Sequence, residues 1–157
     1  MAWAPLTTTI TVRARGDGDL DRAWLHYRTP ALWSRWSPQI RSVDTDHPHR
    51  PVAVGTAGTV HGPAGARVSF VVTDVDAAAR QWTWQVQAGL ITLELEHGVV
   101  DTGRGTQAWA RINGPLPVVL AYAPLARLAL GRLVGGGSGS VGDVAGFPGS
   151  DGAERGR

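Results

Sequence analysis

The sequence places one histidine, a residue capable of acid–base chemistry, among apolar side chains. If residues 90–99 form a strand, His97 shares one of its faces with aliphatic residues, among them Leu93 and Leu95, because successive side chains alternate between faces. An imidazole in such a place can act as a general acid or base, or can hydrogen-bond a ligand. A buried neutral histidine that bonds a neighbouring group is the other interpretation, and the pattern leaves both open.

Two tryptophans define a second candidate site in the segment RQWTWQV, residues 80–86. Trp82, Trp84 and Val86 share one face of the expected strand, and glutamines and a threonine occupy the other face. Rings of this size on one face indicate either core packing or the wall of a ligand cavity. The two interpretations are compatible, because a ligand cavity is a core that is left incompletely filled.

Further candidates come from the neighbouring elements. The alternation in residues 66–74 puts Val68 and Phe70 on the same inner face. Trp33 and Trp36 lie on the apolar side of a short helix, where they either pack on the sheet or gate a cavity mouth. Tyr122 lies on a long apolar helix and could face the same cavity.

Several other chemistries find no support in the sequence. The chain has no cysteine, which excludes disulfides and thiol catalysis, and no glycine-rich phosphate loop or nucleophile-elbow serine is present. His47 and His49 follow two aspartates in the run DTDHPH, but no other ligand type converges on them. We therefore expect neither a metal nor a cofactor.

Charge and composition restrict the partners. The formal net charge is +2, all fifteen basic residues are arginines, and they are scattered along the chain rather than clustered. This pattern disfavours nucleic-acid binding. The absence of lysine beside abundant alanine, glycine and valine is typical of a GC-rich genome, such as that of an actinobacterium.

The elements that must position these side chains follow one another in a simple order. A strand at 6–15 precedes a helix capped by Asp19 and a second helix that starts at Thr29-Pro30 with the Thr29 hydroxyl as its cap. Strands are then expected at about 39–46, 55–61, 66–74, 80–88, 90–99 and 105–113. Their short links indicate antiparallel meander pairing.

A long apolar helix over 116–134, bent or started at Pro124, completes the predicted domain, which spans residues 1–134. Residues 135–157 are rich in glycine and poor in apolar side chains, so we expect a disordered tail there. The helix is nearly long enough to span a bilayer, but Arg127 and Arg132 interrupt its apolar run. A buried amphipathic helix, without stable membrane insertion, is the favoured interpretation.

The chain resembles the START-like, helix-grip superfamily (SRPBCC), in particular its bacterial polyketide cyclase/dehydrase and lipid-transport branch. The resemblance covers about residues 6–134 and rests on the element order and on the segments LWSRWSPQIRSV, RQWTWQV and LELEHGVVDTGRGTQAWARI. It implies an α+β fold in which a curved antiparallel sheet of about seven strands wraps around a long C-terminal helix. It also implies a deep cavity for lipids, polyketides or other apolar molecules.

Three functions follow from this resemblance and from the inward residues. The leading one is binding of a hydrophobic small molecule between the sheet and the last helix. An alternative is a polyketide cyclase or dehydratase that uses His97 in that cavity, and a second alternative is a membrane-associated lipid carrier. Whether the chain is an enzyme stays open, as does the choice between monomer and homodimer. We expect a cytoplasmic location, because no secretory signal is visible at the N-terminus.

Overall fold

The structure is a computed structural model that describes residues 6–135 of the chain. Its elements are, in order, β1 (Thr7–Gly16), α1 (Leu20–Arg28), η1 (Pro30–Leu32), α2 (Trp33–Trp36), β2 (Ser42–Thr45), β3 (Ala57–His61), η2 (Pro63–Gly65), β4 (Arg67–Asp76), β5 (Gln81–Ala88), β6 (Ile91–Asp101), β7 (Thr106–Pro115) and α3 (Leu116–Val134). The predicted order of strands and helices is confirmed. The predicted tail lies, apart from Gly135, outside the described residues.

The strands form one antiparallel sheet in the order β1-β7-β6-β5-β4-β3-β2. From β2 to β7 each strand pairs with the next one in sequence, as the short links predict. Strand β1 joins at the opposite edge, where it pairs with β7 along its whole length. The result is the predicted helix-grip fold, a curved sheet that holds a long C-terminal helix.

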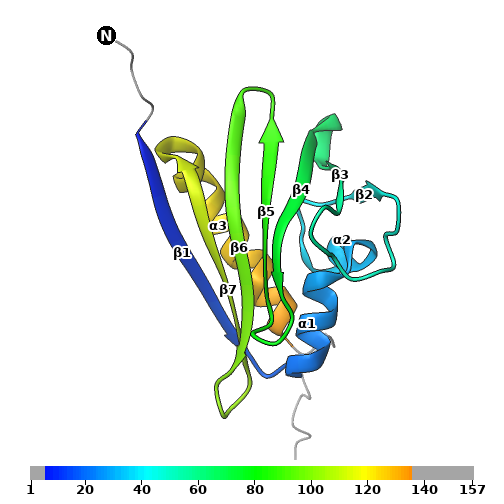
Figure 1. Ribbon diagram of the computed structural model, residues 1–157. Coiled ribbons are helices and arrows are strands. Elements are labelled where there is room, and N and C mark those ends of the chain that lie inside the picture. The colour runs from blue at the N-terminus through cyan, green and yellow to red at the C-terminus, as the bar shows by residue number, and fades with distance from the viewer. Residues whose placement is uncertain (1–5, 136–157) are drawn as a thin grey trace, which may run out of the picture.

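Helix α3 runs diagonally across one face of the sheet (Figure 1). It packs chiefly on β1 and β7, and it buries the side chains of Val119, Ala126, Leu130 and Leu133. Its last turn is tied to the loop before α1, because the Gly18 N–H donates to the Val134 carbonyl at 2.8 Å. The half of the sheet formed by β3 to β5 therefore needs cover from other side chains.

The chain between β1 and β2 departs from the prediction at its second helix. The Asp19 carboxylate caps α1 by accepting from the Arg22 N–H at 3.0 Å, as expected. The predicted cap at Thr29 is wrong, because its hydroxyl is buried without a hydrogen-bond partner and a 3-10 turn precedes α2. The strand expected over 39–46 is also shorter, since the Ile40 N–H closes a turn onto the Ser37 carbonyl.

Two further details concern prolines and pairing. Helix α3 begins at Leu116 and continues through Pro124, so that proline does not start it. Strand β4 contains a bulge at Thr73, where the register with β5 shifts between Val72 and Asp74. The bulge lets Val75, rather than an aspartate, lie opposite Trp82. The inner face of β4 thus stays apolar to its end.

Candidate functional site

The inner face of β5 forms the centre of the candidate site. Trp84 lies between Val72 of β4 and Leu95 of β6, and Trp82 lies opposite His97. One pair further along, Val86 lies between Phe70 and Leu93. The neighbours on both strands are therefore the ones that the alternation predicts.

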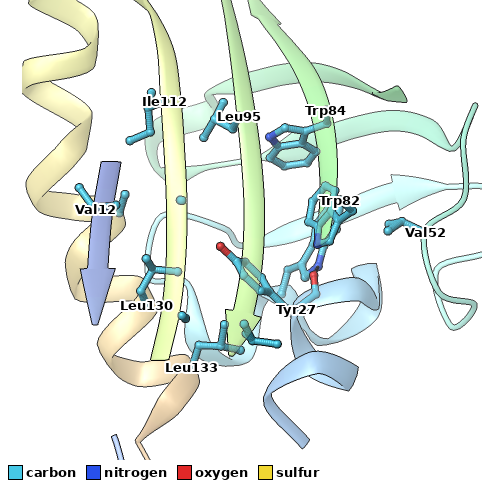
Figure 2. Packing of buried hydrophobic residues seen from close by; sticks show 14 of the residues in the cluster. Val12, Tyr27, Val52, Trp82, Trp84, Leu95, Ile112, Leu130 and Leu133 are labelled. Atoms are coloured by element: carbon cyan, nitrogen blue, oxygen red, sulfur yellow. Dashed lines mark hydrogen bonds between the residues drawn. The ribbon is translucent and has the colours of Figure 1, made fainter. Parts of the chain in front are cut away.

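Trp33 fills the space above this stripe. Its ring stacks parallel on Trp82 with centroids 5.6 Å apart, and it meets the rings of Trp84 and Phe70 edge-on at 5.1 and 5.7 Å. The Trp33 indole N–H donates to the Tyr27 carbonyl at 2.9 Å. Figure 2 shows Tyr27, Trp82 and Trp84 projecting into the same space. These rings form a packed group, called here the aromatic cluster: Tyr27, Trp33, Phe70, Trp82 and Trp84.

His97 joins the aromatic cluster from β6. Its imidazole stacks on Trp82 at a centroid distance of 4.0 Å, and the Tyr27 ring meets it edge-on at 5.2 Å. Its Nδ1 lies 3.3 Å from the Trp82 carbonyl oxygen. Because a carbonyl oxygen only accepts, Nδ1 carries the proton and Nε2 keeps its lone pair. Burial lowers the pKa of His97 to about 3, although the bond to Trp82 opposes the shift, so the ring is neutral at physiological pH.

Two hollows lie between the aromatic cluster, α3 and the sheet. The inner chamber measures about 40 Å³ and is lined by the cluster residues other than Phe70, by His97, and by Ala126, Ala129 and Leu130 of α3, among others. The outer chamber measures about 320 Å³. Its lining is aliphatic or aromatic apart from Gln39, and it includes Val68, Val86, Leu93 and, from α3, Val118 and Leu125.

The two chambers share one wall. Gln39, Ile40, Trp84, Leu95 and Tyr122 line both of them. Within this wall the Gln39 amide N–H donates to the Tyr122 hydroxyl oxygen at 3.2 Å, which joins the segment after α2 to helix α3. Burial raises the pKa of the Tyr122 phenol despite that bond, so the phenol stays protonated. No charged side chain lines either chamber.

Several buried polar atoms of the inner chamber's lining residues have no partner among the described residues. They are Trp82 Nε1, Trp84 Nε1, Ser37 Oγ and Gln39 Oε1. Buried polar groups in folded proteins are nearly always hydrogen-bonded, and each unpaired one costs about 1–3 kcal/mol of stability. The site therefore holds hydrogen-bonding capacity that the protein itself does not use.

The structure brings most of the predicted site residues together. Trp82, Trp84, Leu95, His97 and Tyr122 line the inner chamber, and Val68, Val86 and Leu93 line the outer one. Phe70 packs against Trp33 and Trp84 but lines neither of the two chambers. Trp33 and Trp36 line the inner chamber only, and Trp33 is 1% exposed, so it does not stand at an open mouth.

Sequence reasoning missed part of the lining. On α3, the residues Val118, Leu125, Ala126 and Ala129 recur with Tyr122 at helical spacing, and this period could have identified them. Ser37 and Gln39 carry no such signal, because they lie in the irregular segment between α2 and β2. Tyr27 of α1 is buried and also lines the inner chamber, and its hydroxyl donates to the Trp109 carbonyl at 3.0 Å.

The histidine-rich loop gives no second site in the described residues. No group of three histidine, aspartate or glutamate side chains suited to a metal occurs within residues 6–135. His61, which has no evident partner in the sequence, pairs with Asp44 across β2 and β3 at 2.7 Å. The short strand β2 makes this pair, and a pattern along the chain cannot show it.

A comparison with protein families decides the affiliation of the chain. The model of the family described as "Polyketide cyclase / dehydrase and lipid transport" matches residues 6–141. The chain belongs to this family. No curated protein matches its sequence. The family match confirms the predicted superfamily for this polyketide cyclase/dehydrase family member.

Solved structures show the same fold for the family member. One of them is norcoclaurine synthase from Thalictrum flavum, in complex with dopamine and hydroxybenzaldehyde. Its TM-score is 0.56 at 16% identity, and the match covers 82% of this chain and 86% of that one. At this identity the likeness establishes a shared fold, and the function must be argued from the site.

Proposed function

We propose that the protein binds a hydrophobic small molecule, polyketide-like or lipid-like, in the outer chamber. The observation that carries this proposal is the chamber of about 320 Å³, whose lining is apolar except for Gln39 and the polar ends of Trp84 and Tyr122. Ligand pockets typically have volumes of about 300–1,000 Å³, mostly apolar walls and a few polar groups. Family membership and the shared fold support the same class of ligand.

Filling the outer chamber should weaken this binding strongly. Val68 lines the chamber, whereas Val71 on the same strand faces outward and is 39% exposed. We expect Val68→Trp to weaken the binding of N-phenyl-1-naphthylamine, a neutral fluorescent probe, by about tenfold or more because the indole takes its place. Val71→Trp is the matched control and should bind as the wild type does. The proposal would be contradicted if the wild type showed no saturable binding of the probe. It would also be contradicted if Val68→Trp bound the probe as tightly as the wild type does.

Ring closure or dehydration in the same cavity is the enzymatic alternative, and it depends on His97. Its free Nε2 could accept a proton, but a pKa of about 3 makes it a weak base near neutral pH. The protonated form that a general acid requires is also scarce. Tyr27, whose pKa burial raises well above its usual value, adds no ionised group. These observations support binding better than acid–base catalysis.

The outer face of α3 supports a second function, reversible docking of a lipid carrier on an anionic membrane. Within residues 6–135, α3 is the helix whose length and composition would allow it to cross a bilayer, although its inner face belongs to the core. Leu120 and Leu128 on its outer face are 54% and 51% exposed. They share a groove with four arginines, which are Arg13, Arg15, Arg127 and Arg132.

Vesicle co-sedimentation tests this docking. We expect the protein to sediment with phosphatidylcholine vesicles that contain phosphatidylserine and much less with pure phosphatidylcholine, because each arginine contributes about 1 kcal/mol near an anionic surface. Arg127→Glu with Arg132→Glu should abolish the difference, and Arg104→Glu, in the β6–β7 turn, should not. Equal sedimentation with both vesicle types would argue against a charged docking face. A cytoplasmic location stays a prediction under either function.

A further inference from the structure

The wall between the two chambers indicates which chemical groups a bound ligand carries. This inference rests on the function proposed above. A molecule in the outer chamber contacts three wall residues that carry polar groups: Gln39, Trp84 and Tyr122. The rest of that chamber's lining offers only apolar surface. A ligand with one polar end would therefore place that end at the wall.

The hydrogen-bonding groups at this wall lack partners in the protein. Trp84 is 8% exposed, and its indole N–H is buried without an acceptor. In Figure 2 the indole nitrogen of Trp84 points toward Leu95, another residue of the same wall. Gln39 Oε1 is a buried acceptor without a donor, and the Tyr122 hydroxyl accepts from Gln39 while no group among the described residues accepts its own proton. The wall thus offers both donors and an acceptor.

Behind the wall, the inner chamber continues the same chemistry. Trp82, 2% exposed, has a second unpartnered indole N–H, and the neutral His97 adds an acceptor at Nε2. About 40 Å³ is enough for a hydroxyl or carbonyl group with the atoms next to it, but it is too small for a second ring. The apolar body of a ligand must therefore stay in the outer chamber.

The charge of the lining excludes ions as ligands. The side chains of both chambers carry no formal charge, and the arginines of the described residues all lie outside their linings. A carboxylate or phosphate placed at the wall would lose its hydration without gaining a counter-ion, which is strongly unfavourable. A neutral oxygen loses less hydration and gains two or three hydrogen bonds.

We propose that the ligand is a neutral, largely apolar molecule with one oxygenated end. Its apolar body occupies the outer chamber, and a hydroxyl or carbonyl oxygen meets the wall, where it accepts from the Trp84 indole N–H. A hydroxyl also donates to Gln39 Oε1. The site selects such molecules over plain hydrocarbons, which leave the wall unpaired, and over fatty-acid anions, which bring an uncompensated charge.

Three probes of one shape separate these cases by calorimetric titration at neutral pH. They are naphthalene, 2-naphthol and 2-naphthoate. We expect 2-naphthol to bind about tenfold more tightly than naphthalene, as one or two well-made hydrogen bonds would give, and 2-naphthoate to bind most weakly. Trp84→Phe should reduce the ratio of 2-naphthol to naphthalene affinity severalfold. Trp24→Phe, a buried tryptophan of α1 outside both chambers, should leave that ratio unchanged.

The outcomes distinguish this inference from the proposed function. Equal affinity for the three probes, or tightest binding of 2-naphthoate, would overturn the neutral-oxygen specification while leaving a hydrophobic site in place. An unchanged ratio in Trp84→Phe would overturn the role of that indole. If none of the probes binds saturably, the proposed function fails together with the inference.

Discussion

Replacement of Trp33 by alanine should lower the free energy of unfolding by about 3–5 kcal/mol. Trp33 is 1% exposed and touches three other rings of the aromatic cluster, so its removal leaves a cavity that the β5 side chains cannot close. Each aromatic pair adds about 0.5–1.5 kcal/mol beyond the buried area. The Tyr27 carbonyl also loses its donor. For a domain of this size, such a loss is a large fraction of the total stability.

Urea unfolding followed by far-ultraviolet circular dichroism measures this effect without depending on the tryptophan signal. Trp33→Phe keeps most of the ring and should cost less, including about 1 kcal/mol for the lost hydrogen bond. Leu90→Ala, at a side chain that is fully exposed in the β5–β6 turn, should change the free energy of unfolding by no more than about 0.5 kcal/mol. A loss below about 1 kcal/mol in Trp33→Ala would show that the cluster is not the packed unit described above.

Acidification should destabilise the protein through His97. The folded pKa of His97 is about 3, because burial penalises the charged ring, whereas an unfolded histidine titrates near 6.5. The unfolded state therefore binds a proton first as the pH falls. The contribution of the neutral ring is fully present above about pH 6.5 and is lost progressively down to the folded pKa. Between about pH 7 and pH 5 the expected loss is about 2 kcal/mol.

The comparison of His97→Gln with the wild type isolates the contribution of His97 to the pH dependence of stability. Urea unfolding at several pH values should show a shallower decline for the variant, since glutamine cannot take up a proton and can still donate to the Trp82 carbonyl. His47→Gln, at an exposed loop position, should follow the wild-type curve. Identical declines in His97→Gln and the wild type would contradict a neutral, buried His97. The pKa of His26 is also lowered, so this residue also destabilises the folded protein as the pH falls. Because the wild type and both variants contain His26, its contribution does not affect the comparison.

The inner face of the sheet could be predicted because strand side chains alternate strictly. The period of two places Trp82, Trp84, Leu95 and His97 on one side of two neighbouring strands, and short turns fix which strands are neighbours. The order of elements along the chain added the long helix opposite. These two regularities were sufficient for the fold and for the lining residues at the centre of the sheet.

The division of the cavity could not be predicted, because it depends on contacts between distant segments. That Trp33 stacks on Trp82, and that Gln39 meets Tyr122, follows from how the segment 29–41 lies over the sheet. No local pattern encodes that placement. The bulge at Thr73 is similar, since a one-residue shift of register is determined by what lies opposite rather than by the strand itself.

The stacking of Trp33 on Trp82 has a consequence for how this domain can change over evolutionary time. These rings occupy volume between the sheet and α3 that a larger guest would need, and they also account for much of the tight packing there. A smaller residue at position 33 would enlarge the inner chamber, at a cost of about 1 kcal/mol of stability for each added cavity volume of about 40 Å³. Variants that bind bulkier ligands must therefore first acquire stabilising substitutions elsewhere. The size of the ligand and the stability of the fold are thus expected to evolve together.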